Sequence, residues 1–452
     1  MMRLLFILVI GALVVADTFS VGMSAGAGLS VKNALIYPIA LGLMFRMALT
    51  GGFRMRLPVL NAAWVVWITY AILTWIAIVT VIQYPGYEVR ATGISLKSLM
   101  MDSGIFFFTF FYGVDSEKDF FVLTKVFALG IVVANVMTLA DVAGIVHLGI
   151  TVGTEGVEAD RVFGVFGHAN DTAALIVCVL PLLAAVATSS RGWARIFWFI
   201  GALSSIAVLM LTVSRGAYVG VAVGYAWALW LCRRHLPSSR VVAWVLIGIT
   251  SLILAVGLAA VVMPQFLETL TDRLLNQSLA VSASTASSGR TSMWLASLHV
   301  MMTHPITFLT GYGWRTHELR FTLLTHNDYL DQWFELGLVG LLAFLTIFYQ
   351  TVTTALRAVA VAPAHLRPYM IALVFGMLGL AVSIFFVNLE RPWDYVWIYV
   401  GLTLRAAAEA VEKAQSPISP ATQPTIKAAG RMPEARAQTR AARPRLISDV
   451  RR

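Results

Sequence analysis

Long blocks of apolar residues, separated by short polar connections, run along almost the whole chain. A block of about 20 such residues is long enough to cross the hydrocarbon core of a bilayer as a helix. The pattern therefore predicts an all-α polytopic membrane protein with about twelve transmembrane helices. These helices are expected near residues 4–22, 34–50, 59–82, 97–113, 120–146, 170–188, 194–213, 216–232, 241–263, 336–355, 369–387 and 395–409.

One polar interval, residues 264–335, is much longer than the other connections and is expected to form a large loop. Within it, Arg290 precedes apolar residues at helical spacing that stop at Pro305. Arg290 is therefore predicted at a helix amino terminus, where free backbone N–H groups favour an anion. Asn327 is predicted to cap a later helix, whose first turns are acidic and which runs directly into an apolar span. His326 lies immediately before that helix.

These patterns divide the chain into five segments. Residues 1–146 and 336–410 are expected to be the amino-terminal and carboxy-terminal groups of transmembrane helices, and residues 147–263 the central group. Residues 264–335 are the predicted extracytoplasmic loop. After residue 410 the periodicity ends and Pro, Ala, Gln and Arg dominate, so residues 411–452 are predicted to be a disordered basic tail.

Composition agrees with a membrane protein, because 59% of the 452 residues are hydrophobic and only 12% are charged. The net charge of +10 comes largely from arginines in short loops and in the tail, and with twelve spans these loops all fall on one side. Positively charged loops mark the cytoplasmic side. Both termini are therefore predicted to be cytoplasmic, and residues 264–335 to lie outside. The charge is a topology signal rather than a sign of nucleic-acid binding.

The first span resembles a signal peptide in length, but an uncleaved inner-membrane helix is the expected form. The two cysteines, Cys178 and Cys232, fall within or at the ends of spans. Neither a disulfide framework nor a thiol metal site is expected from them.

Three arginines are predicted on the outer side, where the same rule disfavours them: Arg161, Arg215 and Arg290. Arginine recognises phosphate by planar, two-point hydrogen bonding, so the three together suggest a diphosphate anchored in lipid. His326 has an ordinary pKa of about 6.5 and is able to accept a proton from an incoming hydroxyl group at neutral pH. The carboxylates show no zinc or magnesium spacing, so neither a metal nor another cofactor is expected.

Four motifs occur in order along this part of the chain. The first runs from Arg161 through Gly164-Val-Phe-Gly-His168-Ala-Asn170, and the second is Ser214-Arg215-Gly216. The third is Ser288-Gly289-Arg290. The fourth is His326-Asn327 followed by Glu335-Leu-Gly-Leu-Val-Gly340. In this order they resemble the O-antigen ligase and polysaccharide polymerase superfamily of bacterial inner-membrane glycosyltransferases, although Ala169 stands where many members have proline.

The resemblance implies a helical, GT-C-like glycosyltransferase that uses an undecaprenyl-diphosphate-linked glycan outside the cytoplasmic membrane and inverts the anomeric carbon without a metal ion. By the same resemblance His326 is the general base, and Arg215 and Arg290 bind the diphosphate. Arg161, His168 and Asn327 are further expected substrate-binding residues.

Polymerisation of lipid-linked repeat units into exopolysaccharide or O-antigen is the first functional hypothesis. A ligase that transfers the finished glycan to lipid A core or to protein would use the same donor and the same residues. A transporter of the same lipid-linked sugar is the third, although polar residues crowded at one boundary favour an enzyme. The expected partners are the lipid-linked glycan, an acceptor glycan or lipid A core, membrane lipid and a chain-length regulator, without nucleic acid.

Overall fold

The computed structural model describes residues 2–415 except residues 20–23, 27–28, 51–54, 149–160, 237, 263–264, 273–288, 322–324 and 391. The predicted basic tail lies outside the described residues from residue 416 onward, as do residues 273–288 of the predicted extracytoplasmic loop. Structural statements below concern the described residues.

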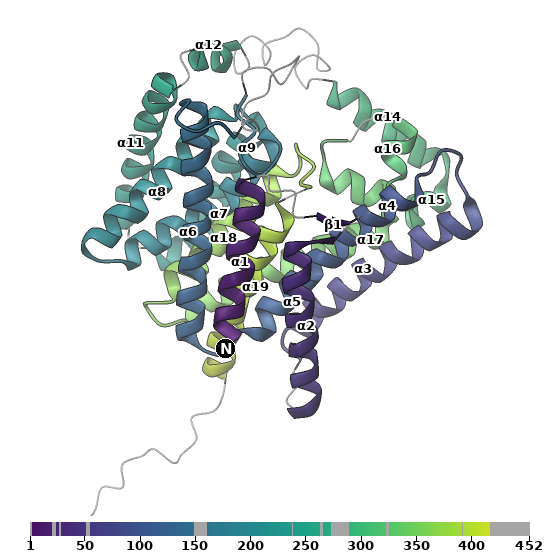
Figure 1. Ribbon diagram of the computed structural model, residues 1–452, viewed down its shortest axis with the longest axis horizontal. Helices are drawn as coiled ribbons and strands as arrows, with labels where there is room; N and C mark the ends of the chain where they lie inside the picture. The colour runs from purple at the N-terminus through teal and green to yellow at the C-terminus, as the bar shows by residue number, and fades with distance from the viewer. Residues whose placement is uncertain are drawn as a thin grey trace, which may run out of the picture. The chain divides into compact units, whose positions relative to one another are not determined.

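Each of the twelve predicted spans coincides with helical structure (Figure 1). The first half of the chain forms α1 (Met2–Thr18), strands β1 (Ser24–Gly26) and β2 (Leu29–Ser30), α2 (Val31–Thr50), α3 (Pro58–Ala77), η1 (Ile78–Ile82), α4 (Val89–Leu96), η2 (Lys97–Met101), α5 (Asp102–Gly113), α6 (Glu117–Val142), α7 (Ala169–Ser189) and α8 (Gly192–Leu211). The second half forms α9 (Arg215–Val219), η4 (Gly220–Gly224), α10 (Tyr225–Cys232), η5 (Arg233–His235), α11 (Ser238–Val262), α12 (Phe266–Thr271), α14 (Arg290–Thr303), α15 (Pro305–Thr310), α16 (Thr316–Phe321), α17 (Asp328–Val361), α18 (Arg367–Ser383) and α19 (Trp393–Gln415).

The chain is a helical, polytopic membrane protein. By length and composition, seven of the described helical segments are able to cross a membrane, and two shorter apolar helices lie at 248–261 and 367–383. The number of twelve crossings stays a prediction. Besides the helices, the described residues include one short antiparallel pair formed by β1 and β2.

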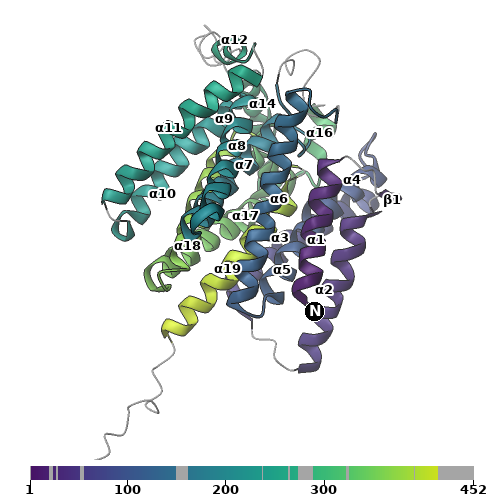
Figure 2. The ribbon, with the colours of Figure 1, turned by 60° about the vertical axis from the view of Figure 1, so that its left-hand side comes forward.

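Close backbone approach holds α7, α18 and the α9–α10 segment together (Figure 2). A Cβ added to Gly376 of α18 would lie 2.1 Å from the carbonyl oxygen of Cys178 in α7. A Cβ on Gly224 would lie 2.6 Å from the Cα atom of Gly379 in α18. Small residues of this kind let membrane helices pack with their backbones close together. Cys178 and Cys232, in α7 and α10, are buried, free thiols.

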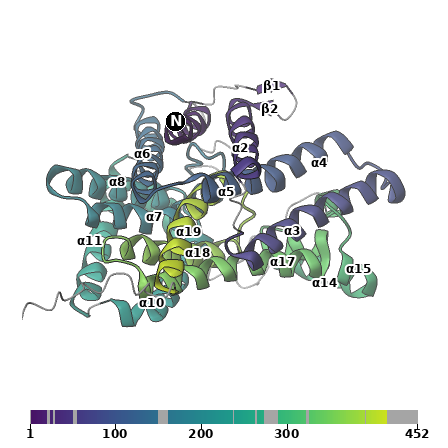
Figure 3. The same cartoon turned by 90° about the horizontal axis from the view of Figure 1, so that it is seen from below.

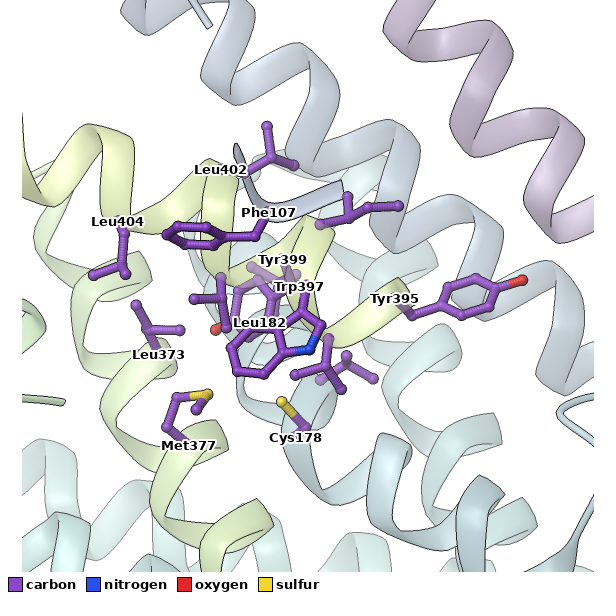
Figure 4. Close-up of a cluster of buried hydrophobic side chains, with 14 of the residues drawn as sticks. Phe107, Cys178, Leu182, Leu373, Met377, Tyr395, Trp397, Tyr399, Leu402 and Leu404 are labelled. Atoms are coloured by element: carbon purple, nitrogen blue, oxygen red, sulfur yellow. The ribbon is translucent and has the colours of Figure 1, made fainter. Parts of the chain in front are cut away.

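The aromatic face of α19 forms the centre of the largest apolar cluster (Figure 4). Trp397 is fully buried, and its ring centroid lies 4.6 Å from that of Trp64 in α3 and 5.3 Å from that of Trp393. Phe107 of α5 joins the same cluster. Seen from below, α3 and α17 run side by side, and the two helices contact each other (Figure 3). This packing fixes α17, α18 and α19, whose ends carry the polar residues discussed below.

A group of mutually paired polar side chains, here called the paired network, links α2, α5 and α19. Asp102 is fully buried and accepts hydrogen bonds from Lys97 at 2.9 Å and from Asn33 at 2.8 Å. Lys32 forms an ion pair with Asp394, another buried carboxylate. Because a charge in an apolar interior is costly unless it is paired, these contacts explain how acidic residues are accommodated beside the spans.

Candidate functional site

The first two motifs are hydrogen-bonded to each other. Arg161 is buried, and its guanidinium group donates from Nε to the carbonyl oxygen of Thr212 at 3.0 Å and from Nη2 to Oδ1 of Asn170 at 2.9 Å. The hydroxyl group of Ser214 donates to the same Asn170 oxygen at 3.0 Å. Arg161 therefore fixes the beginning of α7 against the turn that precedes α9.

The cap of α7 differs from the prediction. The sequence suggests Asn170 or Asp171 as the capping residue, but the helix begins earlier and His168 is its N-cap, with Nδ1 accepting from the backbone N–H of Asn170 at 3.2 Å. The amide oxygen of Asn170 is already occupied by Arg161 and Ser214. The His168 ring also stacks on Phe163, with 5.6 Å between ring centroids.

Arg215 opens α9 directly after a tight turn, as predicted. The helix α8 ends at Leu211, and Val213 in the turn has a φ of 46°. Next to Arg215, Gly216 packs against Phe386, where an added Cβ would lie 2.6 Å from the Phe386 Cβ atom. Only glycine allows this approach. The Ser-Arg-Gly turn is thus positioned against the segment that follows α18.

Arg290 is the first residue of α14, which confirms its predicted place at a helix amino terminus. Its Nη1 atom donates to the carbonyl oxygen of Phe386 at 2.8 Å. Arg290 and the Arg215 turn therefore meet at the same residue. The indole of Trp294, one turn along α14, donates to the carbonyl oxygen of Thr325 at 2.8 Å and joins α14 to the His326 segment.

His326 has a left-handed backbone conformation, with a φ of 53°, immediately before α17. Asn327 caps that helix as predicted, because its Oδ1 accepts from the N–H of Leu330 at 3.1 Å. Burial, the largest cause, together with the charges of Arg290, His168 and Arg161, lowers the pKa of His326 to about 4, although Glu390 acts in the opposite direction. These effects place His326 among three residues predicted for the site and keep its imidazole neutral at pH 7.

The amino-terminal ends of α9 and α14 lie at the same end of the helices, opposite the amino terminus of α1 (Figures 1 and 2). In the described residues no group of three or more His, Cys, Asp or Glu side chains is arranged to hold a metal ion. The arrangement offers a neutral base next to cationic groups. Such a site is suited to deprotonating a hydroxyl group beside a bound anion.

Comparison with known proteins finds a family match over about the central third of the chain. Residues 200–345 match the family model described as O-antigen ligase. The match confirms, over this region, the resemblance that the four motifs carry. No curated protein matches the chain.

Arg215, Arg290, His326 and Asn327 lie inside the O-antigen ligase region, whereas Arg161 and His168 precede it. The structure nevertheless brings the two parts together through the Arg161 bonds and through the electrostatic effect on His326.

The helix after Asn327 runs directly into the apolar span, as predicted, because α17 extends from Asp328 to Val361, but it contains an interruption that the sequence analysis did not predict. Within the O-antigen ligase region, Gly337 has a φ of 61° and a ψ of −164° and interrupts α17. The loop at Gly311 inserts there, since the backbone N–H groups of Tyr312 and Gly313 donate to the carbonyl oxygens of Phe334 and Glu335, both at 2.8 Å. The loop thus satisfies carbonyl groups that the interruption releases from the helix.

The segment that joins α18 to α19, residues 384–390, is part of the site and was not recognised from the sequence. The carbonyl oxygen of Ile384 accepts from the N–H of Asp328 at 3.0 Å, next to His326. Glu390 accepts from Arg315 at 2.8 Å; the ion pair that the sequence suggests between Glu390 and its neighbour Arg391 stays a prediction, because Arg391 lies outside the described residues. No local pattern predicts these contacts, because they join positions far apart in the sequence.

A pocket is lined by residues of η2, α3 and α17 together with Asn388, Leu389, Glu390 and Trp393, and is here called the acidic pocket. Four carboxyl groups and one guanidinium group line it: Asp328, Asp331, Glu335, Glu390 and Arg315. The acidic residues at 328, 331 and 335 follow helical spacing, so their shared face could have been foreseen. The prediction treated them only as charges at a helix start.

Proposed function

We propose that this protein is a membrane glycosyltransferase that polymerises undecaprenyl-diphosphate-linked oligosaccharide repeat units into exopolysaccharide or O-antigen on the outer side of the cytoplasmic membrane. The observation that carries the proposal is the neutral imidazole of His326 next to Arg290 within the O-antigen ligase region. A base beside a cationic group is what transfer of a sugar from a diphosphate to a hydroxyl group requires.

In this proposal His326 is the general base. It takes the proton from an acceptor hydroxyl group while the hydroxyl oxygen attacks the anomeric carbon of the donor, and the bond from that carbon to the diphosphate oxygen breaks. Undecaprenyl diphosphate leaves with its electron pair, and the anomeric centre inverts. Bound diphosphate adds negative charge near the imidazole and therefore raises its pKa, which makes His326 a stronger base when substrate is present.

Arg215 and Arg290 are the proposed diphosphate ligands. Both begin helices, so backbone N–H groups add to the positive field of the side chains. Arg161, His168 and Asn327 have a different proposed role. Because Arg161 is buried and bonded to the motifs around it, while His168 and Asn327 cap helices, we assign them to positioning rather than to direct contact with substrate.

Ligation of a finished glycan to lipid A core is the second candidate, and the description of the matched family as O-antigen ligase favours it. Polymerase and ligase share the donor and differ in the acceptor. A strain that lacks the gene separates them: loss of polymer with one repeat unit left on lipid core supports the polymerase. Free, full-length polymer that is absent from lipid core supports the ligase.

Complementation of that strain tests the proposed chemistry. We expect His326→Ala to give no polymer or ligated glycan at an unchanged membrane level of protein. His365→Ala is the matched control, since His365 is an exposed histidine bonded to Glu117, away from the site. Glycan of normal amount and length from the His326→Ala strain would exclude the general-base role.

A further inference from the structure

We infer that the acidic pocket binds the terminal sugar of the acceptor glycan and so presents its hydroxyl group to His326. The inference rests on the proposed transferase function and adds a site for the second substrate.

The first argument is the chemistry of the lining. Carboxyl groups accept hydrogen bonds from hydroxyl groups, and a sugar offers several of them in fixed directions. Three indole rings, Trp67, Trp314 and Trp393, also line the pocket, and aromatic surface suits the apolar face of a sugar ring. Two of these rings are locked in place: Trp67 donates to Gln332 at 2.7 Å, and Trp314 donates to the carbonyl oxygen of Thr92 at 3.1 Å.

The second argument is a set of buried oxygen atoms that the described residues leave without hydrogen-bond donors. Oδ1 of Asn388 and Oδ1 of Asp331 both belong to side chains that line the pocket and are more than nine-tenths buried. The hydroxyl group of Thr325 is near Asp331 but donates to the carbonyl oxygen of Asn327. Buried acceptors without donors are costly, so these oxygens favour a ligand that brings hydroxyl groups.

The third argument is that groups of opposite charge act on His326. The positive charges of Arg290 and Arg161 lower the pKa of His326, whereas the negative charge of Glu390, which lines the pocket, raises it. Among the residues that line the pocket, the guanidinium group belongs to Arg315, and it is already bonded to Glu390 at 2.8 Å. The diphosphate therefore belongs beside the arginines, and the phosphate-free sugar of the acceptor belongs in the pocket.

The test uses purified full-length protein in lipid nanodiscs. The probe is a phosphate-free oligosaccharide, prepared by mild acid from the surface glycan of the strain that carries the wild-type gene. Binding is followed through tryptophan fluorescence, because three indoles line the pocket. We expect saturable binding to the wild type, weakened at least tenfold by Asp331→Asn.

Three further variants keep the test decisive. Leu99→Trp fills the pocket from η2 without removing a carboxyl group and should weaken binding to a similar extent. Asp17→Asn is the matched control: Asp17 accepts from Tyr395 at 2.8 Å outside the pocket, and this variant should bind the probe as the wild type does. Arg290→Lys should leave binding of the phosphate-free probe unchanged.

The outcomes separate the two proposals. Saturable binding that needs Asp331, without any transfer of glycan in membranes, would remove the proposed function and leave a saccharide-binding pocket. Transfer with a normal KM for acceptor in both Asp331→Asn and Leu99→Trp would overturn the acceptor site while the transferase stands. A probe that does not bind the wild-type protein would also overturn it.

Discussion

The paired network and the acidic pocket are both made of buried polar side chains beside membrane spans, but their charges are matched differently. In the paired network Lys97 and Asn33 bond to Asp102, and Lys32 pairs with Oδ2 of Asp394, whose Oδ1 has no donor among the described residues. In the acidic pocket four carboxyl groups face one guanidinium group, and two buried oxygens have no donor among the described residues. A buried carboxylate that has a cation as its partner is accommodated within the fold, whereas several carboxyl groups gathered around one cation in a cavity are typical of binding sites.

The same comparison applies to the arginines. Arg161 is buried and donates two hydrogen bonds, to Thr212 and Asn170, so it holds these neighbours in position. Arg290 is only half-buried and donates Nη1 to a backbone carbonyl group. Position in the packing, rather than residue type, distinguishes an arginine that braces the site from one suited to binding an anion.

Among the variants that test this comparison, the largest expected effect on activity comes from Arg290. We expect Arg290→Lys to lower kcat/KM for transfer by about 10- to 100-fold with little change in thermal stability, because lysine keeps the charge but loses the planar donor geometry. Transfer assays with membranes and a melting curve check this. Arg46→Lys is the control, since Arg46 makes two 2.9 Å bonds to Asp115 at an exposed place away from the site. Full activity of Arg290→Lys would contradict a two-point contact with diphosphate.

A substitution in the paired network should lower stability and leave activity unchanged, which is the reverse of the effect expected for Arg290→Lys. Lys32→Met leaves the buried carboxylate of Asp394 without its cation, and such a loss costs about 3 kcal/mol in the free energy of unfolding. We expect a lower melting temperature but normal specific activity of the protein that remains folded. Lys32→Met combined with Asp394→Asn should recover most of the stability. A double variant no more stable than the single one would show that the pairing is not the source of the effect.

The interruption of α17 at Gly337 lies just after the turns of this helix that line the acidic pocket. A Cβ at Gly337 would lie 2.2 Å from the carbonyl oxygen of Leu309, and its φ of 61° is strained for other residues. We expect Gly337→Ala to cost about 1–3 kcal/mol of stability and to lower activity by displacing the start of α17. Gly257→Ala in α11 meets no atom within 4 Å and should be neutral in both measurements.

The smallest expected effect is a shift in pH dependence. Because burial and nearby cations hold the pKa of His326 near 4, below its ordinary 6.5, the unfolded chain binds more protons between these values. The contribution of His326 to stability is therefore complete above pH 6.5 and is lost as the pH falls toward 4. We expect kcat/KM to be unaffected by the protonation of His326 above about pH 5 and to fall near pH 4, where the imidazole becomes protonated.

Arg290→Gln provides the check on that prediction. Removing one of the charges that lower the His326 pKa should move the acid limb of the residual activity to higher pH, although burial, the largest cause, still acts. An acid limb at the same pH in both proteins would show that a different group is titrating.

The sequence alone determined the class of the protein and the local features of its site. Apolar blocks of membrane length placed the helices, because a backbone in lipid has to satisfy its own hydrogen bonds. Local rules also placed Arg290 at the beginning of α14 and Asn327 at the cap of α17, since capping depends on neighbouring residues.

Only the tertiary structure decided what these features meet. The carbonyl group of Phe386 bonded to Arg290, the partner of Glu390 and the insertion of the Gly311 loop beside Gly337 all join residues distant in sequence. Periodicity shows which face of a helix is polar but not which segment lies opposite. The acidic residues of α17 looked like ordinary helix-start charges until packing placed them around a cavity. Burial and the surrounding charges, which determine the chemistry of His326, are properties of that packing.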